Sequence, residues 1–291
     1  MKLINRRESQ RYPGLFIKKY TKKVFWDNLW HEDPELLESR GHVELADGTR
    51  VINPFTKIFN HGENDVTIDP KEHCLYIRKV NGFMACATYV PSVGSVVVST
   101  SGSLDSEYVE LAEKHLDGAK KFIKWIYEIE GVAKTFMFEI CDFTDVHIVP
   151  EKFGAYLIGQ REVDSDTPYY TDWNNEVALD IAAEYMGVKR PWFGEDYFEK
   201  IVEYAKNCTH EGYVVYGISS GTVLKIKSPY YLGCKAIARK KDILSLDKSR
   251  VDEEFYGIIA HLKNEWISKQ FNALNEQDRL AYIRDYFKNN C

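Results

Sequence analysis

Residues 211–227 read EGYVVYGISSGTVLKIK, and this stretch decides the fold that we expect for the chain. Two apolar runs flank the turn Ser219-Ser220-Gly221, which is the pattern of a β-hairpin. Because side chains alternate between the faces of a strand, Lys225 and Lys227 are expected on one face. Two neighbouring ammonium groups repel each other, and a polyanion bound to that face would offset the repulsion. An edge strand with solvated lysines would show the same pattern.

The rest of the chain is predicted from apolar spacing and turn residues. Hairpins are expected over 42–52, around Asp47-Gly48, and over 83–100, around residues 91–94; buried strands are expected over 136–141 and 153–161. Helices are expected from near 104, capped by Ser103, and over 118–129, 174–186 (ended by Gly187), 195–207, 251–267 and 276–288. The predicted fold class is α+β, with antiparallel sheets and flanking helices in residues 1–240 and a small helical C-terminal module in 241–291.

Composition places limits on the kind of protein. The chain has 291 residues, 44% of them hydrophobic, and a net charge of −6, so a nucleic-acid partner would need a local basic patch. The six cysteines form no CxxC pair, which fits reduced thiols in a cytoplasm and argues against a structural zinc site. The N-terminus lacks the apolar core of a signal peptide, and no apolar run is long enough for a membrane span.

Lys79 is the candidate nucleophile, within Lys79-Val80-Asn81-Gly82. A lysine amine attacks only when deprotonated, a state that nearby cations or desolvation favour. Lys225 and Lys227 could supply such cations. Gly82 would let a backbone approach a phosphate closely. A surface lysine before a turn would give the same local pattern.

Two glutamates are candidates for binding roles. Glu139 interrupts the apolar run 136–140 and needs a partner if it is buried, such as ribose hydroxyls, a metal or an arginine. A structural salt bridge is the alternative. Glu211 opens the apolar run 213–215, where it could hold Mg²⁺ by oxygen ligation. An exposed glutamate at the start of a strand is the alternative there.

Arg40 and Lys57 lie on either side of the first predicted hairpin. Both are candidates for contacts with a triphosphate, and solvated surface charges are the alternative. His147 and His210 have no ligand spacing, so both are expected to be structural.

Taken in order, these segments resemble the covalent nucleotidyltransferase superfamily. More narrowly, they resemble ATP-dependent RNA ligases of the phage RNA ligase 1 type over about residues 10–235. Residues 79–82 are similar to the nucleotidyl-lysine motif, and 138–139 with 155–159 resemble the central pair of motifs. Residues 211–215 and 224–228 resemble the last two motifs.

The resemblance implies a fold of the nucleotidyltransferase (ATP-grasp-like ligase) type and a reaction. ATP, with Mg²⁺ or Mn²⁺, would adenylylate Lys79; AMP would pass to an RNA 5′-phosphate, and a 3′-hydroxyl would displace it. The substrate would be RNA with 5′-phosphate and 3′-hydroxyl ends, nicked tRNA among the candidates. Glu139 would hold the ribose, Glu211 the metal, and Lys225 and Lys227 the phosphates. The remaining residues implied at the ATP or RNA end are Arg40, Lys57, Asn81, Gly82 and Tyr156.

Two positions depart from the phage pattern. Asn81 stands where the phage enzymes have Asp, whereas eukaryotic tRNA ligases resemble this chain in having Asn. Residues 98–103 lack the two lysines that the phage enzymes show there. The alternatives are a related nucleotidyltransferase that acts on DNA ends and a catalytically weak ATP- or RNA-binding protein. The C-terminal module is expected to orient RNA, and the location to be the cytoplasm, or a host cytoplasm for a phage-encoded protein.

Overall fold

The computed structural model describes residues 2–247, 249 and 251–290, and its backbone divides into two compact units. The first unit comprises Met1–Phe59, Gly82–Asp142 and Lys152–Phe193. The second comprises Asn60–Asn81, Phe143–Glu151 and Gly194–Cys291. The chain therefore passes repeatedly from one unit to the other, so residues of one unit come from distant parts of the sequence.

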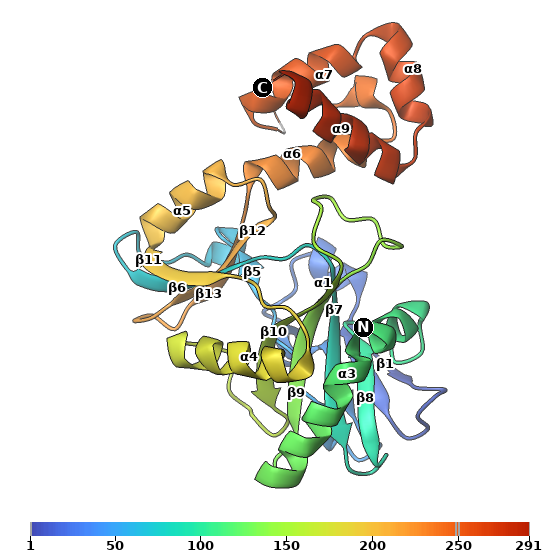
Figure 1. Ribbon diagram of the computed structural model, residues 1–291, viewed down its shortest axis with the longest axis vertical. Coiled ribbons are helices and arrows are strands. Elements are labelled where there is room, and N and C mark those ends of the chain that lie inside the picture. Colours follow the sequence, from blue (N-terminus) through green and yellow to red (C-terminus); the bar gives the residue numbers. More distant parts are fainter. Residues whose placement is uncertain (1, 248, 250, 291) are drawn as a thin grey trace. The chain divides into compact units, whose positions relative to one another are not determined.

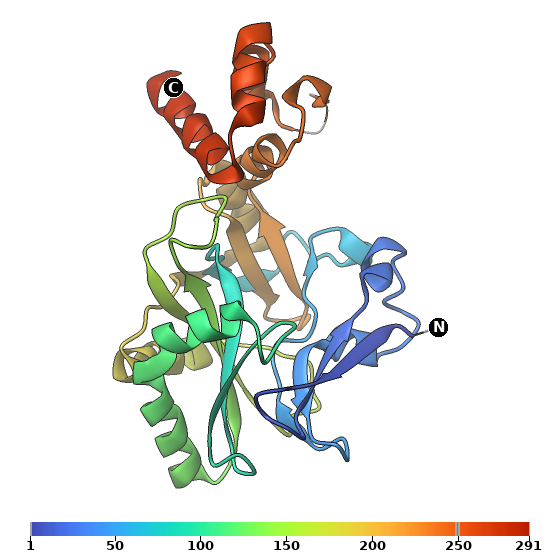
Figure 2. The same ribbon diagram turned by 90° about the vertical axis from the view of Figure 1, so that its right-hand side faces the viewer.

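Two antiparallel sheets form the first unit (Figures 1 and 2). One has the order β1 (Ile4–Glu8), β2 (Phe16–Tyr20), β3 (Arg40–Glu44), β4 (Arg50–Ile52); the other has the order β10 (Gly154–Glu162), β9 (Lys134–Cys141), β7 (Phe83–Val90), β8 (Ser95–Thr100). The predicted hairpins over 42–52 and 83–100 are confirmed as β3–β4 and β7–β8. The two sheets are joined where the Asn53 backbone N–H donates to Thr135 Oγ1 of β9 at 2.8 Å. The predicted α+β class is likewise confirmed.

Helices cover the second of these sheets. The helices of the first unit are α1 (Lys22–Trp26), α2 (Glu35–Glu38), α3 (Glu107–Glu130) and α4 (Trp173–Met186). Buried residues of α3 and α4, such as Leu116 and Leu179, share one apolar core with Phe136 and Phe138 of β9. Figure 1 shows both helices lying along this sheet. Gly187 ends α4 in the left-handed conformation, as predicted.

The prediction of two separate helices near 104 and over 118–129 was wrong. One helix of 24 residues spans this region, and Ser106, not Ser103, is its N-cap. Ser103 instead accepts a hydrogen bond from the Asp105 backbone N–H and one from Arg7. Gly118 lies inside this helix, and a Cβ there would lie 3.4 Å from the Met186 carbonyl oxygen, an ordinary contact distance that shows how near the end of α4 lies.

A third sheet has the order β11 (Phe193–Tyr197), β6 (His73–Arg78), β12 (Gly212–Gly217), β13 (Val223–Lys227), β5 (Phe59–Asn60). The hairpin predicted from residues 211–227 is confirmed as β12–β13. Helix α5 (Phe198–Asn207) packs on this sheet through Phe198 and Ile201. The helix predicted over 195–207 therefore begins later than expected, because residues 193–197 form β11.

The C-terminal part of the second unit is helical, with α6 (Pro229–Ala238), α7 (Tyr256–Leu262), α8 (Glu265–Ala273) and α9 (Glu276–Asn290); the short 3-10 turns of this unit include η1 (Glu63–Asp65), η2 (Ile243–Ser245) and η4 (Glu253–Phe255). The predicted helix over 251–267 is divided at Asn264, whose side chain caps α8. Phe255 and Ile259 form a core with Ile237 of α6 and with Ile148 and Val149 of the irregular segment 143–151. No described helix is long and apolar enough to cross a membrane.

Candidate active site

Strand pairing in the second unit brings the two most informative motifs together. In the β6–β12 pair Arg78 lies opposite Tyr213, so the residues after β6 reach the start of β12. The Lys79 backbone N–H donates to the Gly212 carbonyl oxygen at 2.8 Å. Gly212 has a φ of +126°, and a Cβ there would lie 1.9 Å from the Ile226 carbonyl oxygen. Only glycine permits this close approach of β13. The hydrogen bond from Lys79 to Gly212 places Lys79 beside Glu211.

Glu211 is the centre of a cluster of donors. The Lys79 Nζ lies 3.0 Å from Glu211 Oε2, and Asn81 Nδ2 donates to the same oxygen at 2.9 Å. The Lys227 Nζ lies 3.7 Å from the other oxygen, Oε1. The Glu211 side chain is only 4% exposed, so its charge is compensated by these groups rather than by bulk water. The structure thus unites Lys79, Asn81, Glu211 and Lys227, all of which the sequence singled out.

The side chain of Asn81 uses both ends of its amide. While Nδ2 donates to Glu211, Oδ1 accepts a hydrogen bond from the Val149 backbone N–H at 3.1 Å. The Asn81 backbone N–H also donates to Glu151 Oε1 at 3.3 Å. A carboxylate at this position could accept from Val149 but would face Glu211 with a second negative charge. An amide therefore fits this position better than a carboxylate would.

We predict that Asn81→Asp destabilises the protein at neutral pH. The change replaces a donor to a buried carboxylate by an acceptor, and hydrogen bonds to charged groups contribute about 1.5–3 kcal/mol. Urea unfolding should show a lower midpoint for this variant than for Asn5→Asp, which adds the same charge at an exposed residue. The deficit should shrink in acid, where the new carboxyl is protonated and can donate. Equal midpoints for the two variants at neutral pH would contradict this account of Asn81.

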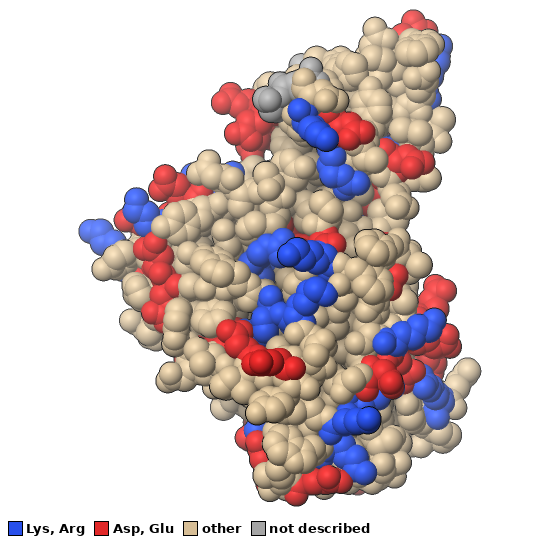
Figure 3. Space-filling model, in the orientation of Figure 1, with Lys and Arg blue, Asp and Glu red and all other residues tan. Residues whose placement is uncertain are grey.

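The lysines of β13 lie as the alternation predicts. Leu224 and Ile226 are buried, whereas Lys225 and Lys227 are half-buried on the opposite face. Burial lowers the pKa of Lys227, and the nearby Lys235 and Lys79 ammonium groups lower it further, while Glu211 acts in the opposite direction. On the face drawn in Figure 3, basic and acidic side chains both occur over much of the surface. An anion would therefore be attracted to this site by the local cluster of lysines, because the net charge of the whole chain is negative.

Five of the predicted residues lie in the first unit. Gly82 directly follows Asn81 in the chain, and its N–H donates to Glu139 Oε1 at 3.0 Å. A Cβ on Gly82 would lie 2.3 Å from the Ile140 carbonyl oxygen, so this position also requires glycine. Tyr156 is opposite Glu139 in the β9–β10 ladder, is buried, and donates through its hydroxyl to the Lys152 carbonyl oxygen at 3.2 Å.

The other two, Arg40 and Lys57, are held by the β1–β4 sheet and its following loop. Arg40 begins β3 and pairs with Lys19 of β2. The Lys57 Nζ lies 4.3 Å from the ring centroid of Phe59 and 5.0 Å from that of Trp30. Stacking of an ammonium group on aromatic faces helps to hold the lysine in place. Roles for both residues at a triphosphate remain predictions.

Sequence reasoning missed several residues of the second unit. Arg78 forms an ion pair with Glu151 at 2.9 Å, and the side chain of Glu151 is 3% exposed. Lys235 and Tyr231 of α6 lie near Lys227. Arg78 could have been suspected from its place before Lys79. Glu151 carries no such signal because segment 143–151 is irregular. No helix was predicted over 229–238, where α6 lies.

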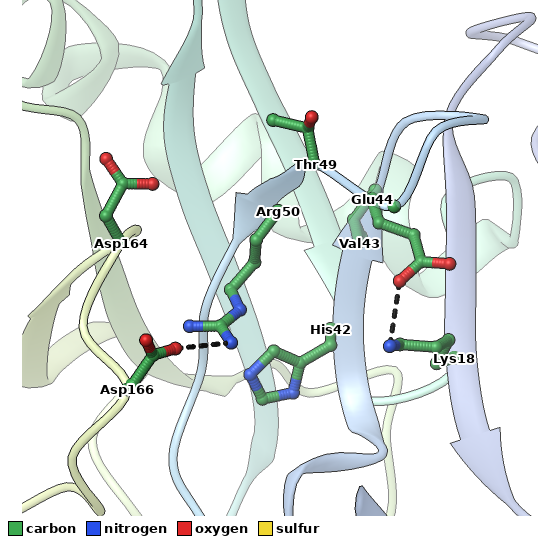
Figure 4. A pocket seen from close by; sticks show the side chains of 9 residues that line it. Lys18, His42, Val43, Glu44, Thr49, Arg50, Asp164 and Asp166 are labelled. Atoms are coloured by element: carbon green, nitrogen blue, oxygen red, sulfur yellow. Dashed lines mark hydrogen bonds and ion pairs between the residues drawn. The ribbon is translucent and has the colours of Figure 1, made fainter.

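A pocket of about 330 Å³ lies in the first unit, beside β3 and β4 (Figure 4). The two cations that line it are paired with carboxylates: Lys18 with Glu44 at 2.8 Å and Arg50 with Asp166 at 3.1 Å. His42 is buried, and desolvation lowers its pKa to about 4. None of the residues predicted to carry chemistry lines this pocket. Its cations are already paired with carboxylates, so we assign it no part in the chemistry of Lys79.

Among the described residues, no group of three or more His, Cys, Asp or Glu side chains gathers in a metal-binding arrangement. Glu211 offers a single carboxylate, and its Oε1 faces Lys227 beyond hydrogen-bond length. Mg²⁺ commonly takes only one or two carboxylates and completes its shell with waters and substrate phosphates. Glu211 fits that kind of site.

The chain was compared with known protein families, curated proteins and solved structures. No protein-family model and no curated protein matches the chain. Several solved structures have a similar backbone, among them two forms of an archaeal ATP-dependent RNA ligase. Form 1 matches with a TM-score of 0.59 at 15% sequence identity, over 91% of this chain and 73% of the ligase chain. Form 2 matches with a TM-score of 0.56 at 15% identity, over 95% of this chain and 72% of the ligase chain. A putative ATP-dependent DNA ligase from Aquifex aeolicus matches with TM-score 0.54 at 12% identity, covering 98% and 75%. The fold is that of ATP-dependent ligases. In this ligase fold, the cluster around Glu211 is the candidate active site.

Proposed function

We propose that this protein is an ATP-dependent RNA ligase that joins 5′-phosphate and 3′-hydroxyl ends through a covalent lysyl-AMP. The observation that supports this most strongly is the contact of Lys79 with Glu211, shared by Lys227, within a ligase fold. A catalytically weak binding protein would have no need to keep a nucleophile, a carboxylate and a second cation in this geometry.

In the first step the neutral amine of Lys79 attacks the α-phosphorus of ATP. An N–P bond forms while the bond from that phosphorus to the bridging oxygen breaks. Pyrophosphate leaves with the electron pair, and the attacking nitrogen loses a proton to solvent. Glu211 Oε2 orients the lysine, and Lys227 stabilises the negative charge that develops on the phosphate oxygens. Mg²⁺ held by Glu211, or Mn²⁺ in its place, would neutralise phosphate charge when it is bound with the nucleotide.

In the second step an oxygen of the RNA 5′-phosphate attacks the phosphorus of the lysyl-AMP. A P–O bond forms, the N–P bond breaks, and the lysine nitrogen leaves with the electron pair and takes a proton from solvent. An RNA 3′-hydroxyl then attacks the phosphorus of the RNA 5′-phosphate. It loses its proton to solvent as the phosphodiester forms, and AMP leaves with the electron pair of the broken P–O bond. By resemblance to phage RNA ligase 1, Lys225 also contacts phosphates, and Glu139 and Tyr156 contact the nucleoside. Arg40 and Lys57 assist at the triphosphate or at the RNA end. We place the reaction in a cytoplasm, with nicked tRNA as one candidate substrate.

A second candidate is sealing of DNA ends, because a putative DNA ligase shares the fold at a TM-score of 0.54. The motif set favours RNA. Paired nicked duplexes that differ only in whether the strand supplying the 3′-hydroxyl is RNA or DNA distinguish the two.

The proposal is tested by incubating the full chain with α-labelled ATP and Mg²⁺. Label should stay on the protein after denaturation and leave it when RNA with a 5′-phosphate is added, whereas RNA with a 5′-hydroxyl should leave it in place. Absence of protein-bound label at saturating ATP, with either Mg²⁺ or Mn²⁺, would refute covalent nucleotidyl transfer.

A further inference from the structure

The start of α6 is fixed to the site around Glu211. The Ser228 backbone N–H donates to the Glu211 carbonyl oxygen at 3.0 Å, and the Ser228 hydroxyl donates to the His210 carbonyl oxygen at 2.5 Å. The same hydroxyl oxygen accepts from the Tyr231 backbone N–H at 3.1 Å and so caps the helix. The side chains of the first turns of α6 therefore hold fixed positions relative to Glu211.

Two lysines share one aromatic ring in this region. The Lys227 Nζ lies 5.2 Å from the centroid of the Tyr231 ring, and the Lys235 Nζ lies 5.6 Å from it. Tyr231 and Lys235 are four residues apart on α6, so they lie on the same side of the helix. The ring is 5% exposed. Lys227 of β13 and Lys235 of α6 therefore lie against the same ring, that of Tyr231. We call these two lysines the α6 cation pair.

The positive charge here exceeds the negative charge that compensates it. Lys79 and Lys227 both form ion pairs with Glu211. Within the part of the chain that the structure describes, no carboxylate forms an ion pair with Lys235. The repulsion among Lys79, Lys227 and Lys235 is strong enough to help lower the pKa of Lys227. An arrangement that costs free energy in the absence of an anion is stabilised when one binds.

We propose that the α6 cation pair binds a phosphate group of the substrate, with Lys235 as a phosphate-binding residue outside the motifs seen in the sequence. This inference rests on the proposed function for its substrate. The phosphate belongs either to the polyphosphate of ATP or to the 5′ end of the RNA. Lys235 extends the cationic surface from β13 onto α6.

The test uses binding to the full chain, which needs no turnover. The probes are inorganic tripolyphosphate, measured by calorimetry, and a short labelled RNA with or without a 5′-phosphate, measured by fluorescence anisotropy. Lys235→Gln removes the charge and keeps the length of the side chain. The matched control is Lys241→Gln, which removes the same charge at a nearby exposed residue. Circular dichroism establishes that the variants are folded, and Lys235→Met is a second charge-removing variant.

One charge-assisted contact corresponds to a loss of affinity of about tenfold or more. Such a loss for tripolyphosphate, in Lys235→Gln but not in the control, would assign the contact to the nucleotide. Loss of the preference for 5′-phosphorylated RNA would assign it to the RNA end, and Lys235→Arg should restore either property. The inference is overturned if Lys235→Gln binds both probes as the control does, or if the unaltered protein binds neither. If the α-labelled ATP assay fails and the binding assays succeed, the ligase proposal is refuted and phosphate binding by Lys235 still stands.

Discussion

Replacement of Lys79 by alanine is expected to abolish labelling of the protein by α-labelled ATP. The reaction needs an amine that reaches the α-phosphorus, and Lys79 is held in place by Glu211 at 3.0 Å and by its backbone bond to Gly212. Lys227 lies farther from the carboxylate and rests on the Tyr231 ring, so it is not positioned to replace Lys79. We expect the loss to fall below detection rather than to a fractional rate.

Two controls make this result specific. Lys71→Ala, at an exposed residue of the same unit, should label normally. RNA that already carries a 5′-adenylate should still be sealed by Lys79→Ala, because that step bypasses the lysine. Labelling of Lys79→Ala at the rate of Lys71→Ala would show that another residue is the nucleophile.

Replacement of Glu211 by glutamine is expected to reduce adenylylation by about 10²-fold or more, the effect of losing one well-placed electrostatic contact at a developing charge. Glutamine has the same shape but no charge, so Lys79 and Lys227 would repel each other without compensation. The Glu211→Gln variant would also lack the carboxylate that we propose as a ligand of the metal ion. The rate of label incorporation at saturating ATP, followed across a range of Mg²⁺ concentrations, measures the effect.

Glu203→Gln is the matched control for this variant, since Glu203 is exposed and forms an ion pair with the exposed Lys200 at 3.6 Å. A change of affinity for Mg²⁺ in Glu211→Gln would support the metal role, whereas a loss independent of Mg²⁺ would support orientation of Lys79. A rate equal to that of Glu203→Gln would return Glu211 to a structural role.

The sequence predicted those features that depend on local pattern. Alternation in residues 223–227 predicted the shared face of Lys225 and Lys227, and the turn dipeptide Asp47-Gly48 predicted the first hairpin. Features that depend on distant pairing were missed or left open. Nothing local shows that Asn81 contacts Glu211 and Val149, which lie 130 and 68 residues away in the chain.

The helix boundaries show the same limit at short range. Ser103 and Ser106 are both acceptable caps by residue type, and the choice between them depends on the contacts that Ser103 makes with Arg7 and Asp105. The break at Asn264 has a local cause, since asparagine caps helices well, yet the apolar spacing continues through it. The roles of Arg40, Lys57, Glu139 and Tyr156 at a nucleotide stay predictions.

The short segment 143–151 has a consequence for how such a protein can evolve. Ile148 and Val149 are buried in the core of the C-terminal helices, and the Val149 N–H holds the amide of Asn81. A lineage that lost or exchanged its C-terminal helices by recombination near residue 240 would expose these two side chains and weaken the contact that holds Asn81. Inheritance of the tail and of segment 143–151 should therefore be linked. Relatives with a different tail should carry altered residues at positions 148 and 149, and their sequences can be inspected for this covariation.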